Sequence, residues 1–167
     1  TIIFDLTIAI EVGLIIACLL FMRRMSETTD VKVVLDEIDP NKESELSQGN
    51  LEHLTIPEGV EVYEINGPYF FGAGNRFEEI MAAFGDRPKV RIIRMRKVPF
   101  VDSTGIHNLT NLCVMSKNEG IEIVLSGVTE KVHKTLEHAG FYKYVPEEDI
   151  CSHINIALER AKEIIKK

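Results

Sequence analysis

The 167-residue sequence contains no tryptophan and only three cysteines, Cys18, Cys113 and Cys151, none of which forms a C-x-x-C pair. This spacing argues against a disulfide framework and against a zinc finger, and it suits a reducing compartment. The five histidines show no metal-ligand spacing with cysteines or paired acids. Because no nucleophile–base pair or catalytic carboxylate pair is evident either, the sequence predicts no enzyme, no metal site and no cofactor.

Positive charge is also scarce. The chain has 19 Lys and Arg against 26 Asp and Glu, a formal net charge of −7, so we expect no broad electrostatic binding of nucleic acid. Hydrophobic residues make up 45% of the sequence and charged residues 27%, which is typical of a globular protein and not of a disordered one. The sequence starts at Thr1, and we expect it to be part of a longer protein.

The N-terminal segment is the most apolar part of the chain. Residues 1–22 carry only two charges, Asp5 and Glu11, and Arg23 and Arg24 follow directly. Twenty-two helical residues would span about 33 Å, close to the thickness of a bilayer core. A buried or amphipathic helix of a soluble protein is the alternative. If the segment spans a membrane, the two arginines place its end in the cytoplasm, and the two acids must face other helices or water.

The next segment is strongly acidic. Residues 27–64 hold eleven carboxylates against two lysines. The part at 36–50 lacks an apolar face and is rich in turn residues, which predicts a solvated loop, and 31–35 is a candidate short strand before it. The chain is therefore divided into a helix at 1–25, an acidic linker at 26–56 and a globular domain at 57–167.

The globular domain alternates short strands with amphipathic helices. Strands are predicted at 60–65, 90–95, 121–125 and 141–145, and helices at 75–84, 106–118, 129–139 and 150–165. This alternation predicts an α/β fold with a mixed, mostly parallel sheet. We expect the helices to pack mainly on one face, because the first of these strands is half polar.

The segment 98–106 runs from a strand into a helix and contains the run Asp102, Ser103, Thr104 and Gly105. Asp102 or Ser103 can cap the helix, whose free N–H groups favour an anion. A phosphate added to Ser103 or Thr104 would be stabilised by the helix dipole and repelled by Asp102, so this site can act as a switch. Plain helix capping is the alternative interpretation.

Six cations lie within eleven residues, namely Arg87, Lys89, Arg91, Arg94, Arg96 and Lys97. Beneath a membrane such a cluster would attract anionic lipid headgroups. It would equally pair with the acidic stretch at 27–64, or form a solvated strand edge that discourages aggregation.

Two parts of the sequence resemble a known family. Residues 98–109, VPFVDSTGIHNL, closely resemble the signature of STAS domains, which sulfate transporters and anti-sigma factor antagonists share. Residues 66–73, NGPYFFGA, look like the transporter branch of these domains. Residues 5–25 are similar to the last membrane helix of SulP-type anion permeases.

The resemblance implies a STAS fold preceded by one transmembrane helix. It further implies a non-catalytic regulatory or assembly domain of a sulfate-like secondary anion transporter, on the cytoplasmic side of the inner cell membrane. The expected partners are the membrane domain of the same transporter, a second copy in a homodimer, and a cytoplasmic protein. In the antagonist branch the second hydroxyl residue after the aspartate is phosphorylated, a position held here by Thr104. A soluble antagonist switched at Thr104 is the alternative, although it needs no apolar segment before the domain.

Overall fold

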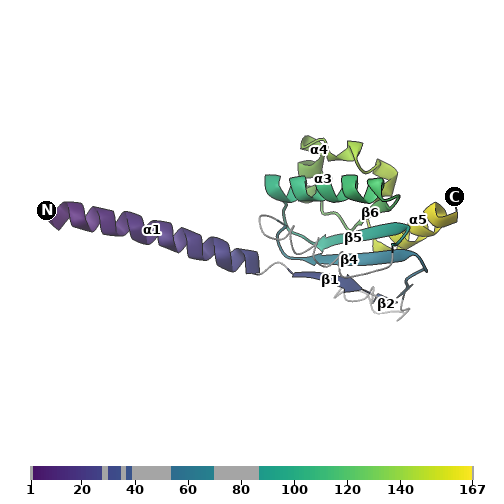
Figure 1. The fold of residues 1–167 in the computed structure, drawn as a ribbon, viewed down its shortest axis with the longest axis horizontal. Coiled ribbons are helices and arrows are strands. Elements are labelled where there is room, and N and C mark those ends of the chain that lie inside the picture. The colour runs from purple at the N-terminus through teal and green to yellow at the C-terminus, as the bar shows by residue number, and fades with distance from the viewer. Residues whose placement is uncertain (1, 28–29, 35–36, 39–53, 70–86, 167) are drawn as a thin grey trace.

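The computed structural model describes residues 2–27, 30–34, 37–38, 54–69 and 87–166 (Figure 1). The helix predicted at 75–84 lies outside these residues, as does most of the loop predicted at 36–50. Two residues of that loop form strand β2, Glu37–Ile38, which pairs with β3, Leu54–Thr55, in a two-stranded antiparallel ladder.

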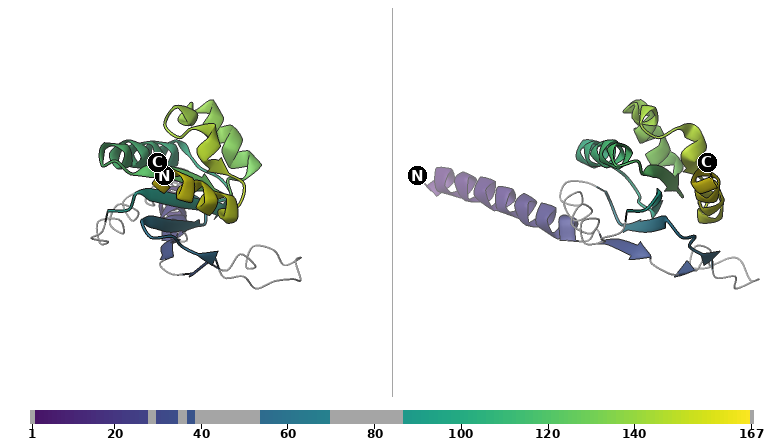
Figure 2. Two further views of the ribbon diagram at one scale, coloured as in Figure 1. Left: turned by 90° about the vertical axis from the view of Figure 1, so that its right-hand side faces the viewer. Right: turned by 45° about the vertical axis from the view of Figure 1, so that its right-hand side comes forward.

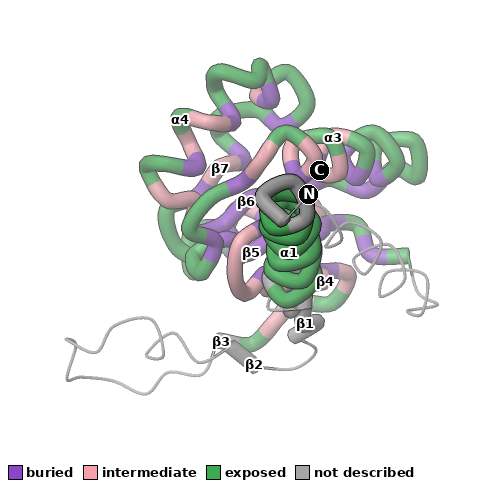
Figure 3. Tube along the Cα trace, turned by 90° about the vertical axis from the view of Figure 1, so that its left-hand side faces the viewer, coloured by how far each residue is buried: buried purple, intermediate pink, exposed green. Residues whose placement is uncertain are grey.

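The first element is the long helix α1, Ile2–Glu27. Its stretch Leu6–Arg24 has 19 residues and a mean hydropathy of 2.2, and none of it is buried. Apolar side chains are exposed around the whole helix, for example Leu14 and Phe21, both 64% exposed. The helix extends away from the domain in Figure 1 and is coloured as exposed in Figure 3. By length and composition it is able to cross a membrane, because 19 helical residues measure about 29 Å.

The main sheet has five strands in the order β1-β4-β5-β6-β7. Strands β4 to β7 are parallel, and β1 runs antiparallel to β4 with Asp30 opposite Asn66. The predicted mixed, mostly parallel sheet is therefore confirmed. The sheet begins at Asp30, within the segment 26–56 that the sequence predicts to be a linker. The strands are β1 (Asp30–Val34), β4 (Val60–Asn66), β5 (Val90–Lys97), β6 (Glu122–Ser126) and β7 (Ile150–Cys151).

Helices cover both faces of this sheet (Figure 2). The helices α3 (Ser103–Asn118) and α4 (Glu130–His138) pack on one face, where Ile93 lies in the same core cluster as Leu109 and Leu136. Helix α5 (Ile154–Lys166) packs on the other face, where Ile92 meets Leu158. The expectation that the helices pack mainly on one face thus holds for α3 and α4, whereas α5 lies on the other face. The opposite face also needs a cover, because successive residues of β5 alternate between two apolar faces.

The C-terminal region differs from the predicted order. The segment predicted as a strand at 141–145 contains a 3-10 turn, Phe141–Lys143, and the last strand is β7. Phe141 and Val145 are both buried while the three residues between them are not. This four-residue spacing belongs to a helical turn and not to the two-residue period of a strand. Helix α5 consequently begins at Ile154, four residues after the predicted start at residue 150.

Arg160 of α5 ties the end of the domain together. Its guanidinium contacts Asp149 at 2.7 Å, Glu148 at 2.6 Å and Glu163 at 3.2 Å. Hydrogen bonding to Asp149 raises the pKa of Arg160 above its usual value. The sequence suggests that the acids at 147–149 begin the last helix, but they form a separate 3-10 turn, Glu147–Asp149, and two of them bind α5 through Arg160.

Loss of this cluster has a measurable expected effect. We expect Arg160→Met to lower the free energy of unfolding by about 2 kcal/mol, because the buried Asp149 carboxylate loses its partner. The control is Lys162→Met on the same helix, whose pair with Glu159 is solvent-exposed, so its removal should cost less than about 0.5 kcal/mol. Urea unfolding of both variants checks this expectation. Equal losses would show that the Arg160 pairs add nothing beyond a surface contact.

Candidate regulatory site at the start of helix α3

The chain before α3 is held against Tyr69, which follows the end of β4. Tyr69 N–H donates to the Phe100 carbonyl at 3.2 Å, and Asp102 N–H donates to the Tyr69 carbonyl at 3.4 Å. Tyr69 and Val101 also form a parallel β-bridge. The first turn of α3 is therefore fixed by backbone contacts between two segments about thirty residues apart in the sequence.

Asp102 is the residue that caps α3. Its backbone is extended, with φ −92° and ψ 178°, and its Oδ1 accepts a hydrogen bond from Gly105 N–H at 2.6 Å. Gly105 is buried, and a Cβ there would lie 2.9 Å from Val101 Cγ1 and would also overlap the Tyr69 carbonyl oxygen. Glycine is required here for space, so that Tyr69 can approach the helix backbone.

The two hydroxyls of the candidate switch differ in access. Ser103 is exposed and Thr104 is half-buried. Within the described part of the chain, neither hydroxyl has a hydrogen-bond partner. A phosphoryl group on either would meet the free N–H groups of the first turn, while the neighbouring Asp102 carboxylate would repel it. The geometry allows both a cap and a switch.

The basic cluster predicted from the sequence is split by the structure. Arg91 and Arg94 are each only 6% exposed, so they do not belong to a surface that faces a membrane. Arg94 lies 3.9 Å from Glu64, which also binds Lys97 at 2.8 Å. These arginines instead pair with glutamates of the acidic stretch, which is one of the alternatives that the sequence left open.

The four other cations of the cluster lie nearer to solvent, at two opposite ends of β5. Arg87 and Lys89 are exposed just before β5, and Arg96 and Lys97 are exposed at its end. Six residues of β5 lie between Lys89 and Arg96, and the seven steps of the extended chain separate the two pairs by about 23 Å. The cluster is therefore not one patch.

A buried polar network that was not predicted from the sequence centres on Arg91. Its Nε lies 3.5 Å from Glu61, and its guanidinium donates to Ser116 Oγ of α3 at 3.1 Å. The Tyr63 hydroxyl donates to Glu61 at 2.7 Å, and burial together with Glu61 raises the pKa of Tyr63. One signal was available in the sequence: glutamates at 61 and 64 face arginines at 91 and 94, with the same spacing on neighbouring strands.

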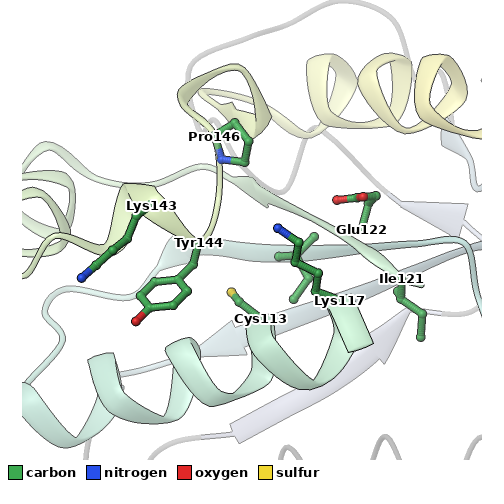
Figure 4. Close-up of a pocket in the computed structure, with 8 residues that line it drawn as sticks. Cys113, Lys117, Ile121, Glu122, Lys143, Tyr144 and Pro146 are labelled. Atoms are coloured by element: carbon green, nitrogen blue, oxygen red, sulfur yellow. The ribbon is translucent and has the colours of Figure 1, made fainter. Parts of the chain in front are cut away.

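A pocket of about 230 Å³ lies at the opposite end of α3 (Figure 4), lined by Cys113, Lys117, Ile121, Glu122, Ile123, Lys143, Tyr144 and Pro146. Burial raises the pKa of the Cys113 thiol to about 12, so the thiolate needed for nucleophilic chemistry is not formed at neutral pH. No pattern in the sequence pointed to this pocket. Among the described residues there is also no group of three or more His, Cys, Asp or Glu side chains that could hold a metal ion.

The two acids of the apolar segment are placed only in part. Glu11 is exposed on α1, while the side chain of Asp5 lies outside what the structure describes. Cys18 is exposed on the same helix, and Cys113 and Cys151 are buried and unpaired.

Comparison with known proteins matches the globular domain to STAS domains. A model of the STAS domain matches residues 53–157. A sulfate transporter family protein from Wolinella succinogenes is 38% identical, with a TM-score of 0.65, and the match covers 68% of this chain and 93% of that one. The STAS domain of a SulP transporter from Vibrio cholerae is 34% identical, with a TM-score of 0.60, over 67% of this chain and 88% of that one. A Thermotoga maritima protein whose name makes it a candidate anti-sigma factor antagonist is 18% identical with a TM-score of 0.55, and it shares the fold alone.

Matches to curated proteins extend beyond the domain. The Bacillus subtilis protein YvdB, a candidate sulfate transporter by its name, is 27% identical over 154 residues, 92% of this chain and 27% of its own length. The bicarbonate transporter BicA of Picosynechococcus is 24% identical over 165 residues, 96% of this chain and 28% of its own length. The chain thus spans little more than a quarter of either relative. Matches of this length must include at least part of α1.

Proposed function

The chain belongs to the STAS domain family, in the branch found in SulP-type transporters, and we propose on this premise that it forms the end of a secondary anion transporter. In this proposal, residues 1–25 are the last transmembrane helix and the rest is a cytoplasmic, non-catalytic regulatory and assembly domain. The membrane domain of the same transporter is its first partner. A homodimer and a cytoplasmic protein partner are further proposals.

The observation that carries this proposal is the exposed apolar helix joined directly to the domain. All of Leu6–Arg24 lies open to its surroundings, and only residues 28 and 29 separate α1 from β1. So large an apolar surface is unfavourable in water and suits the interior of a bilayer. A soluble antagonist needs no such helix, so the transporter interpretation is favoured over that alternative.

The side on which the domain lies follows from charge. Arg23 and Arg24 directly follow the apolar residues, and such positive charges remain in the cytoplasm. The domain that follows them is therefore assigned to the cytoplasmic side of the inner cell membrane. Sulfate and bicarbonate are the anions in the names of the curated relatives, and we propose a small oxyanion of this kind as the substrate.

Uptake by the complete transporter tests this function. Cells that express the full-length parent protein should accumulate labelled sulfate or bicarbonate faster than cells with an empty vector. Gly105→Val, which disrupts the start of α3, should lower uptake several-fold, and immunoblots of membranes separate lost assembly from lost transport. No uptake of either anion by a parent protein present in the membrane would refute the assignment of the substrate class.

The proposal extends to Thr104 as a regulatory position. If the site is used as a switch, intact mass spectrometry of protein from native cells will show one phosphate, and fragmentation will place it on Thr104. The Thr104→Val variant, which keeps the shape of the side chain, is expected to lose that mass. Phosphate that never appears, or that maps to the more exposed Ser103, would leave Asp102 and its neighbours as a helix cap only.

A further inference from the structure

We propose that the edge of the sheet formed by the carboxyl ends of β4, β5 and β6 docks on anionic phospholipid headgroups. This inference rests on the proposed function, because it requires α1 to span the membrane. It adds a lipid-binding surface that shares only Arg96 with the basic cluster predicted from the sequence.

The position of this edge follows from the register of the sheet. From Glu27, the last residue of α1, to Asp30, the first residue of β1, three Cα–Cα steps reach at most about 11 Å. Asp30 pairs with Asn66, the last residue of β4. Since β4, β5 and β6 are parallel, their carboxyl ends all lie at the edge nearest the end of α1. The arrowheads of β4 and β5 in Figure 1 point toward the side where α1 joins the domain.

This edge carries a surface that we call the basic rim, consisting of Arg96, Pro99, Phe100 and Lys131. All four residues are exposed. Lys131 Nζ lies 5.7 Å from the centre of the Phe100 ring. Arg96, near the end of β5, lies beside Gly127, which directly follows β6. A cation beside an exposed aromatic ring is a combination that suits the headgroup region of a bilayer.

Among the side chains that the structure describes, no carboxylate neutralises the charge of the basic rim. Among the described residues, Arg96 and Lys131 have no carboxylate within ion-pair distance. Three described acids nearby are already engaged: Glu64 binds Lys97, Glu130 binds Lys134, and Asp102 accepts from Gly105 N–H. The N-termini of α3 and α4 also point to this edge and add partial positive charge.

Two binding partners of the basic rim are considered, the cytoplasmic loops of a membrane domain and anionic lipid, and they differ in charge. Cytoplasmic loops of a membrane domain carry an excess of Lys and Arg, so they would repel the basic rim. The cytoplasmic leaflet of a bilayer is negatively charged and attracts basic residues. Each Lys or Arg near its surface raises the affinity of the domain for the membrane about fivefold. Arg23 and Arg24 at the end of α1 lie on the same side and add to this attraction. Anionic lipid is therefore the occupant that the structure favours.

The test uses the complete 167-residue chain in nanodiscs of phosphatidylcholine, with or without about one-third phosphatidylglycerol. In a Cys18→Ser background, a fluorophore is attached at Ser103→Cys beside the basic rim, or at Asn118→Cys at the far end of α3. The buried Cys113 and Cys151 should react poorly with the label. Nitroxide groups on the lipid headgroups then quench any label that lies near the membrane.

We expect strong quenching at residue 103 and little at residue 118, in anionic discs only. The pair Arg96→Gln and Lys131→Gln should lower the ratio of docked to undocked chain about fivefold for each cation removed. The matched control, Arg87→Gln with Lys89→Gln, removes the same charge at the opposite end of β5 and should change this ratio less than about twofold.

Three results would overturn the inference. The first is equal quenching at residue 103 in neutral and anionic discs, and the second is an equal loss in the matched control. The third is docking that persists in neutral lipid and requires the complete transporter, because the basic rim would then bind protein loops. Carbonate extraction of sedimentable vesicles, which have the same lipid composition and carry the same chain, distinguishes a failure of this inference from a failure of the proposed function. A chain that resists extraction without quenching refutes lipid docking alone, whereas a chain released by carbonate refutes the membrane-spanning role of α1.

Discussion

Replacing Arg91 by methionine is expected to lower the free energy of unfolding by about 4 kcal/mol, because a buried ion pair then loses one partner. Glu61 would remain largely buried with its negative charge, and Ser116 of α3 would lose its donor. The Tyr63 hydroxyl would still donate to Glu61. The network joins β4, β5 and the last turn of α3, so we expect its loss to destabilise the packing of α3 on the sheet.

A double-mutant cycle shows whether charge is the cause. Glu61→Leu together with Arg91→Met removes both charges and should recover part of the loss, since apolar pairs often replace buried ion pairs at little cost. The rest of the loss should remain, because the buried Tyr63 hydroxyl loses its Glu61 acceptor. The control is Lys89→Met, an exposed cation just before the same strand, with an expected effect within about 0.5 kcal/mol. Because the chain has no tryptophan, urea unfolding of residues 26–167 is followed by circular dichroism. A double variant as unstable as Arg91→Met would contradict the charge argument.

The second large effect is expected at Gly105. Gly105→Ala should lower the free energy of unfolding by about 3 kcal/mol and Gly105→Val by more. The added atoms would overlap the Tyr69 backbone carbonyl, which is held in place by its hydrogen bond to Asp102 N–H. Either substitution would push Tyr69 away and disturb both the Tyr69–Val101 bridge and the Asp102 cap. The bridge and the cap belong to the candidate regulatory site, so the same variants test how that site is built.

The control for Gly105 is Asn111→Val, which places a β-branched residue on the exposed side of α3. It should cost only a few tenths of a kcal/mol, from the difference in helix propensity and the loss of an exposed hydrogen bond between Asn111 Nδ2 and His107 Nε2. Urea unfolding of the three variants, followed by circular dichroism, gives the comparison. Near-equal effects of Gly105→Val and Asn111→Val would mean that space beside Tyr69 is not what requires the glycine.

The features that the sequence predicts correctly are those set by local pattern. Strand β5 is predicted at 90–95 and extends over Val90–Lys97, and α3 is predicted from a run of apolar residues at helical spacing. The cap at Asp102 is predictable for the same reason, because a cap depends on residues within one turn. Such short-range rules need no knowledge of which strands are neighbours.

The features that the sequence does not predict depend on tertiary neighbours. Six cations close together in the sequence suggest one patch, yet Arg91 and Arg94 turn inward to glutamates of β4, about thirty residues earlier. Only the strand order reveals those partners. The turn at Phe141–Lys143 resembles a strand in sequence because a short apolar run fits both structures, and burial against the domain core decides between them.

The central claim is that α1 spans a membrane and carries the domain beneath it. Expressing residues 1–167 and 26–167 side by side tests it most directly, since the shorter form retains every strand from Asp30 onward. After carbonate extraction, only the longer form should remain with the membranes, and the shorter form should be soluble. If both forms are soluble without detergent, α1 is not a membrane span, the transporter proposal falls, and a soluble antagonist switched at Thr104 takes its place.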